Sequence, residues 1–449
     1  MSKYQLIANG SALNSMVIHP QLAKELRMTS SFSQKTLHFG VSSHKVNVQV
    51  SRRVQNGKIV LSRNILQHLR IPTHSYYELR IKEDGIHLGP YVGFLLSHYS
   101  HNLADYLPYL ADYVSFYDQI GGTIIAFGLD GVRKDTRKIH GFVYNPITQK
   151  WEEGLYAYPS SMFIKTAMIP SRDLHYFQAQ MGVAVFNNFN FDKWEMHRLL
   201  SQTEIVEYLP KTKLYRQAGD IESFLKRKER IYLKPLNGSR GRSVARINKN
   251  KKGIWMRYRD KGKNHELVFS KFDQFKKFLK KSVRPKAFII QKAVDLLSYQ
   301  GSIIDFRMLM VKDDQGQWKD VGLVSRYGPL ESVVSNISAG GLAEEGEKTL
   351  QRVLNLSDDE RMEWRQQLRT IAYRVAKILD DSGVKCGNMG VDFAIDSKGR
   401  IWILEIQHNN PDPTLALDAD DPQVYHTILL HHLLYLKGLA GFEGGPVYE

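Results

Sequence analysis

The chain has 449 residues, of which 43% are hydrophobic, so it is long enough for two or three domains with cores of their own. Its apolar stretches fall far short of the roughly 20 residues that a membrane-spanning helix needs, and its first residues do not resemble a secretory signal. The formal net charge is +16, and the single cysteine, Cys386, rules out an intrachain disulfide, so we expect a soluble protein of a reducing, intracellular compartment.

Residues 1–88 predict an N-terminal module resembling a β-barrel. Alternating polar and apolar residues in His44–Val50 and Glu78–Ile81 are typical of short strands. The segments Gln21–Met28 (QLAKELRM) and Asn64–Ile71 (NILQHLRI) resemble each other, and each predicts a short helix beside strands. A duplicated, pseudo-symmetric small barrel explains this match, and a chance similarity explains it equally well.

Residues 89–190 predict a small α/β layer. Tyr91–Leu96 is apolar enough for a buried strand, and Leu103, Leu107, Leu110 and Val114 recur at helical spacing. Gly121 and Gly122 then lead into a second strand, Thr123–Phe127. This order is typical of a β-α-β unit.

Residues 191–449 predict a third domain that begins with a capped helix and continues with many strands. Asp192 as N-cap and Glu195 three residues later favour a helix up to Leu200. A capping box at Ser357 and Glu360 predicts a long helix, and a last helix is expected at residues 422–437.

Basic residues are concentrated in residues 211–292, which contain 26 Lys and Arg against 6 Asp and Glu. Such a segment attracts a nucleotide, an acidic substrate or nucleic acid, although a solvated lysine-rich face explains many of these side chains equally well. Nucleic acid is not favoured, because the basic residues surround a phosphate-type loop and no nucleic-acid fold motif accompanies them.

That loop follows a short predicted strand and runs from Lys234 to Ser243. The backbone N–H groups of Gly238, Ser239 and Gly241 can approach phosphate oxygens, and Lys234 supplies a positive charge. The glycines alone also fit an ordinary β-hairpin turn.

A second cluster lies in a predicted hairpin formed by residues 389–395 and 401–406. Asp392 is near the start of one strand and Glu405 near the end of the other, so antiparallel pairing brings both carboxylates to one point. Two carboxylates beside nucleotide phosphates are suitable ligands for Mg²⁺. Together, the two clusters predict a Mg-ATP site.

The order of these clusters resembles the ATP-grasp superfamily, and the resemblance implies roles for further residues. It implies that Lys193 and Lys234 contact the nucleotide and that the backbone of Gln291, Lys292 and Ala293 receives adenine. It also implies that Arg307 meets the γ-phosphate, and that Asn336 and Gly340 belong to a loop closing over the reaction centre. The metal ligands would be Asp392, Glu405 and Gln407, the last where the superfamily pattern has Asn.

Within that superfamily, Gly89–Leu95, Tyr158-Pro159 and Phe186–Trp194 resemble the YheC/YheD family of endospore coat-associated proteins, in its longer YheD-like branch. The resemblance implies an α+β fold of two subdomains clasping ATP, preceded by the α/β layer and the N-terminal all-β, barrel-like module. It implies an ATP- and Mg²⁺-dependent carboxylate–amine ligase acting through an acyl phosphate.

The same resemblance places the protein in the mother-cell cytoplasm, in association with the spore coat. Its carboxylate and amine substrates stay unidentified, an acidic peptide or coat component being one option. Because Gln407 is one methylene longer than Asn, the alternative is a structural coat protein that binds Mg-ATP without turnover. The segment Ser160–Lys165 also departs from the acidic, Asn- and Arg-bearing pattern expected in this family, which implies a different acceptor if this segment helps to hold the substrate.

Overall fold

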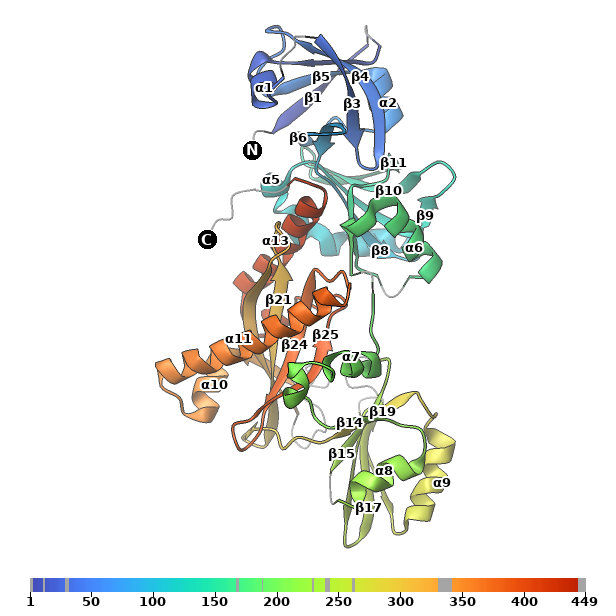
Figure 1. Cartoon of the computed structure of the whole chain (residues 1–449), viewed down its shortest axis with the longest axis vertical. Coiled ribbons are helices and arrows are strands. Elements are labelled where there is room, and N and C mark those ends of the chain that lie inside the picture. The colour runs from blue at the N-terminus through green and yellow to red at the C-terminus, as the bar shows by residue number, and fades with distance from the viewer. Residues whose placement is uncertain are drawn as a thin grey trace.

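The computed structural model describes residues 3–10, 13–28, 32–166, 169–187, 189–227, 230–238, 243–260, 263–329 and 341–442. A closed barrel and three further sheets follow one another along the long axis of the molecule, with the barrel at one end (Figure 1). None of the described helices is long and apolar enough to cross a membrane.

The N-terminal barrel has strand order β1-β5-β2-β4-β3-β7-β6 and carries two short helices. Its elements are β1 (Tyr4–Asn9), β2 (Ser15–Ile18), α1 (Pro20–Glu25), β3 (Phe32–Phe39), β4 (Ser42–Val50), β5 (Lys58–Ser62), α2 (Arg63–Leu69), β6 (Tyr76–Lys82) and β7 (Gly85–Gly89). β1 pairs with β5 in parallel and with β6 antiparallel, and β4 pairs with β2 and β3 in the same two ways. These equivalent pairings, with α1 and α2 at the repeated segments, support the predicted duplication.

The α/β layer has strand order β11-β10-β9-β8-β12-β13. Its strands are β8 (Tyr91–Ser97), β9 (Thr123–Arg133), β10 (Lys138–Asn145), β11 (Lys150–Ala157), β12 (Ser161–Ile164) and β13 (Val185–Phe186), and α6 (Ser171–Met181) lies between β12 and β13. β8 runs parallel to β9 and β12, which confirms the predicted β-α-β unit.

The predicted helix from Leu103 to Val114 is wrong in one respect, because it is broken into short pieces. These are η1 (Ser100–Asn102), α3 (Leu103–Tyr106), η2 (Leu107–Leu110), α4 (Ala111–Val114) and α5 (Tyr117–Ile120). Pro108 lies at the start of η2, where its ring removes a backbone donor and interrupts the α-helical hydrogen bonds.

The third sheet, at the other end of the molecule, has order β14-β19-β15-β16-β17-β18. Its elements, with the helices that precede or cover it, are α7 (Lys193–Leu200), η4 (Glu204–Tyr208), β14 (Thr212–Leu214), α8 (Ala218–Leu225), β15 (Ile231–Pro235), β16 (Ala245–Asn250), β17 (Gly253–Asp260), β18 (Lys263–Phe269), α9 (Phe272–Ser282) and β19 (Phe288–Lys292). Ile221 of α8 and Phe275 of α9 are buried in the core of this unit.

The fourth sheet has order β23-β22-β21-β24-β25, and β20 pairs with β21. Its elements are β20 (Ser298–Tyr299), β21 (Ser302–Lys312), β22 (Trp318–Tyr327), β23 (Leu342–Glu345), α10 (Gly346–Leu354), α11 (Asp358–Asp381), β24 (Asn388–Ile395), β25 (Ile401–Gln407), α12 (Leu415–Asp418) and α13 (Pro422–Leu439). The predicted capping box at Ser357 and Glu360 is present, and α11 packs its apolar face on the sheet.

The last helix, α13, joins this fourth unit to the α/β layer (Figure 1). Leu429 and Leu433 of α13 share one buried core with Val92 and Phe94 of β8. Farther along α13, Lys437 forms a buried ion pair of 2.6 Å with Glu78 in the barrel. The domain limits at residues 89–190 and 191–449 stay a prediction, and α13 connects the two regions.

Candidate active site

A cavity of about 310 Å³ lies between α7, the third sheet and strand β25. One part of its wall is apolar and includes Met196, Leu200, Leu209 and Ile289. The other part is polar and carries Lys193, Lys234, Gly238, Gln291, Glu405, Gln407 and Asn409. An apolar wall continuing into a cationic and carboxylate end is suited to a ligand with a flat ring and a charged tail, such as a nucleotide.

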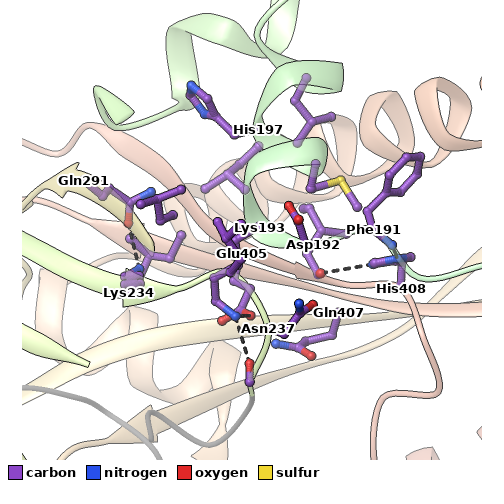
Figure 2. Close-up of a pocket in the computed structure, with 18 of the residues that line it drawn as sticks. Phe191, Asp192, Lys193, His197, Lys234, Asn237, Gln291, Glu405, Gln407 and His408 are labelled. Atoms are coloured by element: carbon purple, nitrogen blue, oxygen red, sulfur yellow. Dashed lines mark hydrogen bonds and ion pairs between the residues drawn. The ribbon is translucent and has the colours of Figure 1, made fainter. Parts of the chain in front are cut away.

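Helix α7 brings Lys193 into this cavity. The Asp192 carboxylate accepts the N–H groups of Trp194 and Glu195, and the Glu195 side chain accepts the N–H of Asp192, so the predicted capping box is confirmed. The Lys193 ammonium lies 2.9 Å from Glu405 Oε1 and donates to the Gly238 carbonyl at 2.9 Å. Figure 2 shows Lys193 and Glu405 side by side on the cavity wall.

Lys234 enters the same cavity from β15. Its ammonium donates to Gln291 Oε1 at 2.7 Å (Figure 2). Gln291 in turn donates to Thr212 Oγ1 at 3.2 Å, so a chain of side chains fixes the position of Lys234. Burial lowers the pKa of Lys234, while Glu405 opposes that shift. A partly desolvated cation with a neutral partner is well placed to bind an anionic group.

The two predicted metal carboxylates lie together, as the hairpin indicates. Asp392 on β24 and Glu405 on β25 are direct cross-strand partners, so their side chains leave the same face of the sheet. A β-bulge follows Asp392 in this pairing. Gln407, two residues beyond Glu405, lies on that face as well.

Asp392 is held by two arginines. Arg307 donates to both of its oxygens at 2.6 and 2.8 Å, and Arg326 approaches Oδ2 at 2.9 Å. Arg326 also donates to both oxygens of Asp305, at 2.7 and 2.9 Å. Burial alone would raise the pKa of Asp392, but the charges of Arg307 and Arg326 outweigh it and lower the pKa to about 2.

Sequence reasoning missed Arg326. Its signal is a cross-strand pairing, since Arg326 on β22 is the direct partner of Asp305 on β21, and opposite charges at such positions attract. The residue pattern alone does not predict the register of this strand pair, because a β-bulge near Leu309 shifts the pairing of β21 with β22.

The side chains of Asp392, Glu405 and Gln407 fit a hard cation in the kind of donor they offer. They present two carboxylates and one amide oxygen on one face, which suits Mg²⁺. Both Asp392 oxygens are engaged by guanidinium groups, so metal binding there requires that at least one of these bonds be exchanged. Glu405 is freer, because Lys193 is its only ion-pair partner in the described part of the chain.

Two of the three residues predicted to receive adenine lie away from the cavity wall. Gly238 and Gln291 line the cavity, whereas Lys292 and Ala293 do not. The N–H groups of Lys292 and Ala293 donate to the carbonyls of Lys211 and Arg230, both at 2.8 Å, so these two donors are already used within the protein. Ser239, Gly241, Asn336 and Gly340 lie outside the described residues.

His408, which follows Gln407, has a structural role. Its buried ring accepts the N–H of Phe191 at Nε2 over 2.8 Å, which requires the neutral imidazole (Figure 2). Burial lowers the pKa of His408 to about 4. The ring therefore fixes the segment before α7 against the end of β25.

A family model described as YheC/D-like ATP-grasp matches residues 182–439, which is more than half of the chain. The chain belongs to the YheC/D-like ATP-grasp family. This match includes Lys193, Lys234, Arg307, Asp392 and Glu405, and it confirms the family resemblance and the fold class predicted from the sequence.

Two relatives within the YheC/D-like family come from Bacillus subtilis. Endospore coat-associated protein YheD is 25% identical over 422 residues, covering 90% of this chain and 88% of the relative. Endospore coat-associated protein YheC is 26% identical over 362 residues, covering 77% of this chain and 95% of the relative.

Solved structures similar to this chain include D-alanyl-alanine synthetase A from Vibrio cholerae, at 11% identity and a TM-score of 0.43, over 76% of this chain and 98% of that one. D-cycloserine synthetase DcsG is 11% identical with a TM-score of 0.43, over 78% of this chain and 98% of that one. These scores are too low to add to the family assignment.

Proposed function

We propose that the protein is an ATP-dependent carboxylate–amine ligase that works through an acyl phosphate. The observation that carries this proposal is the meeting of Lys193, Lys234 and Glu405 in one cavity with an apolar wall. These three residues come from α7, β15 and β25, which are far apart in the sequence and brought together only by the fold.

In this proposal, ATP lies with its adenine ring on the apolar wall near Met196 and Leu209. Lys193 and Lys234 hold the phosphate oxygens, and the backbone of the Gly238–Gly241 loop covers them. Because the N–H groups of Lys292 and Ala293 already donate within the protein, other groups, such as backbone carbonyl oxygens, recognise adenine there. Arg307, which is hydrogen-bonded to Asp392, meets the γ-phosphate beside the metal carboxylates.

Asp392, Glu405 and Gln407 would hold Mg²⁺, which neutralises charge on the phosphates when bound. Arg307 and Arg326 keep Asp392 ionised, since their charges hold its pKa far below neutral pH. Asn336 and Gly340, in the segment predicted to close over the reaction centre, are assigned to excluding water from the acyl phosphate.

The reaction has two balanced steps. A substrate carboxylate oxygen bonds to the γ-phosphorus while the bond to the bridging oxygen breaks and ADP leaves. The amine nitrogen then bonds to the acyl carbon, the carbon–oxygen bond to phosphate breaks, and the nitrogen loses a proton. Because the acyl phosphate is already activated, positioning of the amine is the main requirement of the second step.

A second candidate function is a structural coat protein that binds Mg-ATP without turnover. Two observations favour this candidate. Gln407 stands where the superfamily pattern has Asn, and arginines bind both oxygens of Asp392. Tight Mg-ATP binding with no turnover on any carboxylate and amine would support this candidate over the ligase.

In either case, we infer from the relatives a place in the mother-cell cytoplasm and an association with the endospore coat. The basic segment 211–292 suits an acidic peptide or coat component as a partner. Immunolocalisation in sporulating cells, against a deletion strain, tests this placement.

The ligase proposal is tested by measuring ADP and phosphate release across a panel of carboxylates and amines, with hydroxylamine present to trap the acyl phosphate. We expect release that depends on an added carboxylate and is lost in Asp392→Asn. The matched control is Asp381→Asn, the same change at an exposed position on α11, which should keep full release. Full release in Asp392→Asn would overturn the proposal.

A further inference from the structure

Lys165 lies where the α/β layer meets the candidate active site. It directly follows β12, at the carboxyl end of a parallel strand, and its N–H donates to the Leu95 carbonyl at 3.0 Å. Its own carbonyl accepts a hydrogen bond of 3.3 Å from Asn410 Nδ2. Asn410 adjoins Asn409, which lines the cavity. In open α/β sheets, ligands bind outside the carboxyl ends of the strands.

The ammonium group of Lys165 is half-buried, and its direct contacts are neutral. It donates to the Tyr113 hydroxyl at 3.0 Å and lies over the rings of Tyr113 and Phe163, at 4.8 and 5.1 Å from their centres. Among the residues that the structure describes, no carboxylate forms an ion pair with it. The charge of Asp412 acts on this ammonium without a direct contact, and the Asp412 carboxylate accepts hydrogen bonds from Thr414.

The Tyr113 hydroxyl is a neutral partner and does not compensate this charge. It accepts from Lys165 and shares a hydrogen bond of 2.9 Å with Nδ1 of His432, which is neutral because burial holds its pKa well below the ordinary value. His432 is fully buried. A half-buried cation costs free energy unless a negative group accompanies it, and this cluster supplies only neutral partners.

Asn410 adds a second unused group at the same place. The Lys165 carbonyl fixes its amide orientation, because only Nδ2 can donate to that oxygen. Its Oδ1 is buried and has no hydrogen-bond partner in the described part of the chain. The Lys165 ammonium has no ion-pair partner in the described part of the chain, and Asn410 Oδ1 has no donor there. These two groups, on residues joined by the Asn410–Lys165 backbone hydrogen bond, complement a carboxylate and an amine on one molecule.

We propose that Lys165 binds a free carboxylate of the amine substrate, while Asn410 accepts from its amine nitrogen, so that the acceptor is an amino acid or a short peptide. This assignment rests on the proposed ligase function and names the substrate class that it uses. Lys165 is not part of the wall of the nucleotide cavity. The carboxylate that Lys165 binds is therefore a different group from the substrate carboxylate that is phosphorylated.

The experiment uses the full chain and matched ligand pairs that differ only in the carboxylate: L-alanine with L-alaninamide, D-alanine with D-alaninamide, and glycylglycine with its amide. Each is titrated by thermal shift, with and without Mg-AMP-PNP, up to about 50 mM. We expect at least one acid to bind roughly 10-fold or more tightly than its amide, the range lost with one charged hydrogen bond.

Two variants decide whether Lys165 is responsible. Lys165→Met should remove the preference for the acid, and Lys165→Arg should retain most of it. A second readout is the lysine side-chain NMR signal assigned through Lys165→Arg. Burial lowers the pKa of Lys165 to about 8, and a bound carboxylate should raise that pKa.

Equal binding of acids and amides, or a preference that survives in Lys165→Met, would overturn the proposal. So would the lack of any carboxylate-dependent shift across the panel. Loss of the ligase function alone gives a different pattern, in which wild type shows no turnover but still prefers the acid. Lys165→Met should also bind Mg-AMP-PNP as wild type does, which shows that the variant is folded.

Discussion

The cluster of Arg326, Asp305, Arg307 and Asp392 predicts a large and specific loss of stability when Arg326 is removed. The two carboxylates are 3% and 4% exposed and Arg326 is 5% exposed, so the group is desolvated. With both arginines the four charges sum to zero, and Arg326→Met leaves a net charge of −1. Removing one partner of a buried ion pair costs about 3–5 kcal/mol, because the remaining charge is left uncompensated.

The loss is measured by urea unfolding, with Cys386 as the local probe. Cys386 is fully buried in the same core as Val391 of β24, so its thiol reacts with a disulfide reagent only when this unit opens. Arg369→Met on α11 is the matched control, because Arg369 is 49% exposed and lies 4.0 Å from its partner, so we expect a change within about 0.5 kcal/mol.

A second variant tests the electrostatic cause. Adding Asp305→Asn to Arg326→Met restores the charge balance, so the double variant should be more stable than Arg326→Met alone. A loss below about 1 kcal/mol in Arg326→Met, or no recovery in the double variant, would refute the reasoning.

Three further predictions concern other parts of the chain. Burial raises the pKa of the Cys386 thiol to about 12, so native protein at pH 8 should resist iodoacetamide labelling, and rapid labelling without denaturant would contradict its burial. Asp192→Ala removes the cap of α7 and should cost about 1 kcal/mol in urea unfolding and weaken nucleotide binding through Lys193, whereas Asp192→Asn should retain most of both. The folded pKa of Lys165, about 8, lies below its ordinary 10.5, so the unfolded chain binds more protons between these values and stability rises with pH across that window. Relative to Lys165→Met, we expect a gain of about 2 kcal/mol once partial exposure is allowed for, and a pH-independent difference would count against the burial of this ammonium.

The parts of the site that the sequence predicts are those determined by local pattern. The capping box at Asp192 and the hairpin that pairs Asp392 with Glu405 depend on residues close in the chain, and both are present. The sequence pattern does not predict which strands pair when they are far apart in the chain. Arg326 joins Asp392 only because β21 lies between β22 and β24 in the fourth sheet.

The same limit applies to the fold. Alternation and the repeated segment indicate a barrel, but its closure depends on the non-local pairing of β1 with β6. Likewise, the sequence of α13 predicts an apolar helix but does not indicate that it packs against the α/β layer, because that contact depends on the topology of the whole chain. The contact between Lys165 and Asn410 also joins segments that nothing in the residue pattern connects.

The central claim is that the cavity between α7, β15 and β25 binds Mg-ATP, and calorimetric titration with Mg-AMP-PNP tests it most directly. Wild type should bind, and Lys234→Met should bind roughly 10- to 100-fold more weakly, since a charged hydrogen bond is lost. Lys249→Met, the same change at an exposed position on β16 outside the cavity, should bind as wild type does. Equal affinity of wild type and Lys234→Met, or no binding by wild type, would contradict the claim.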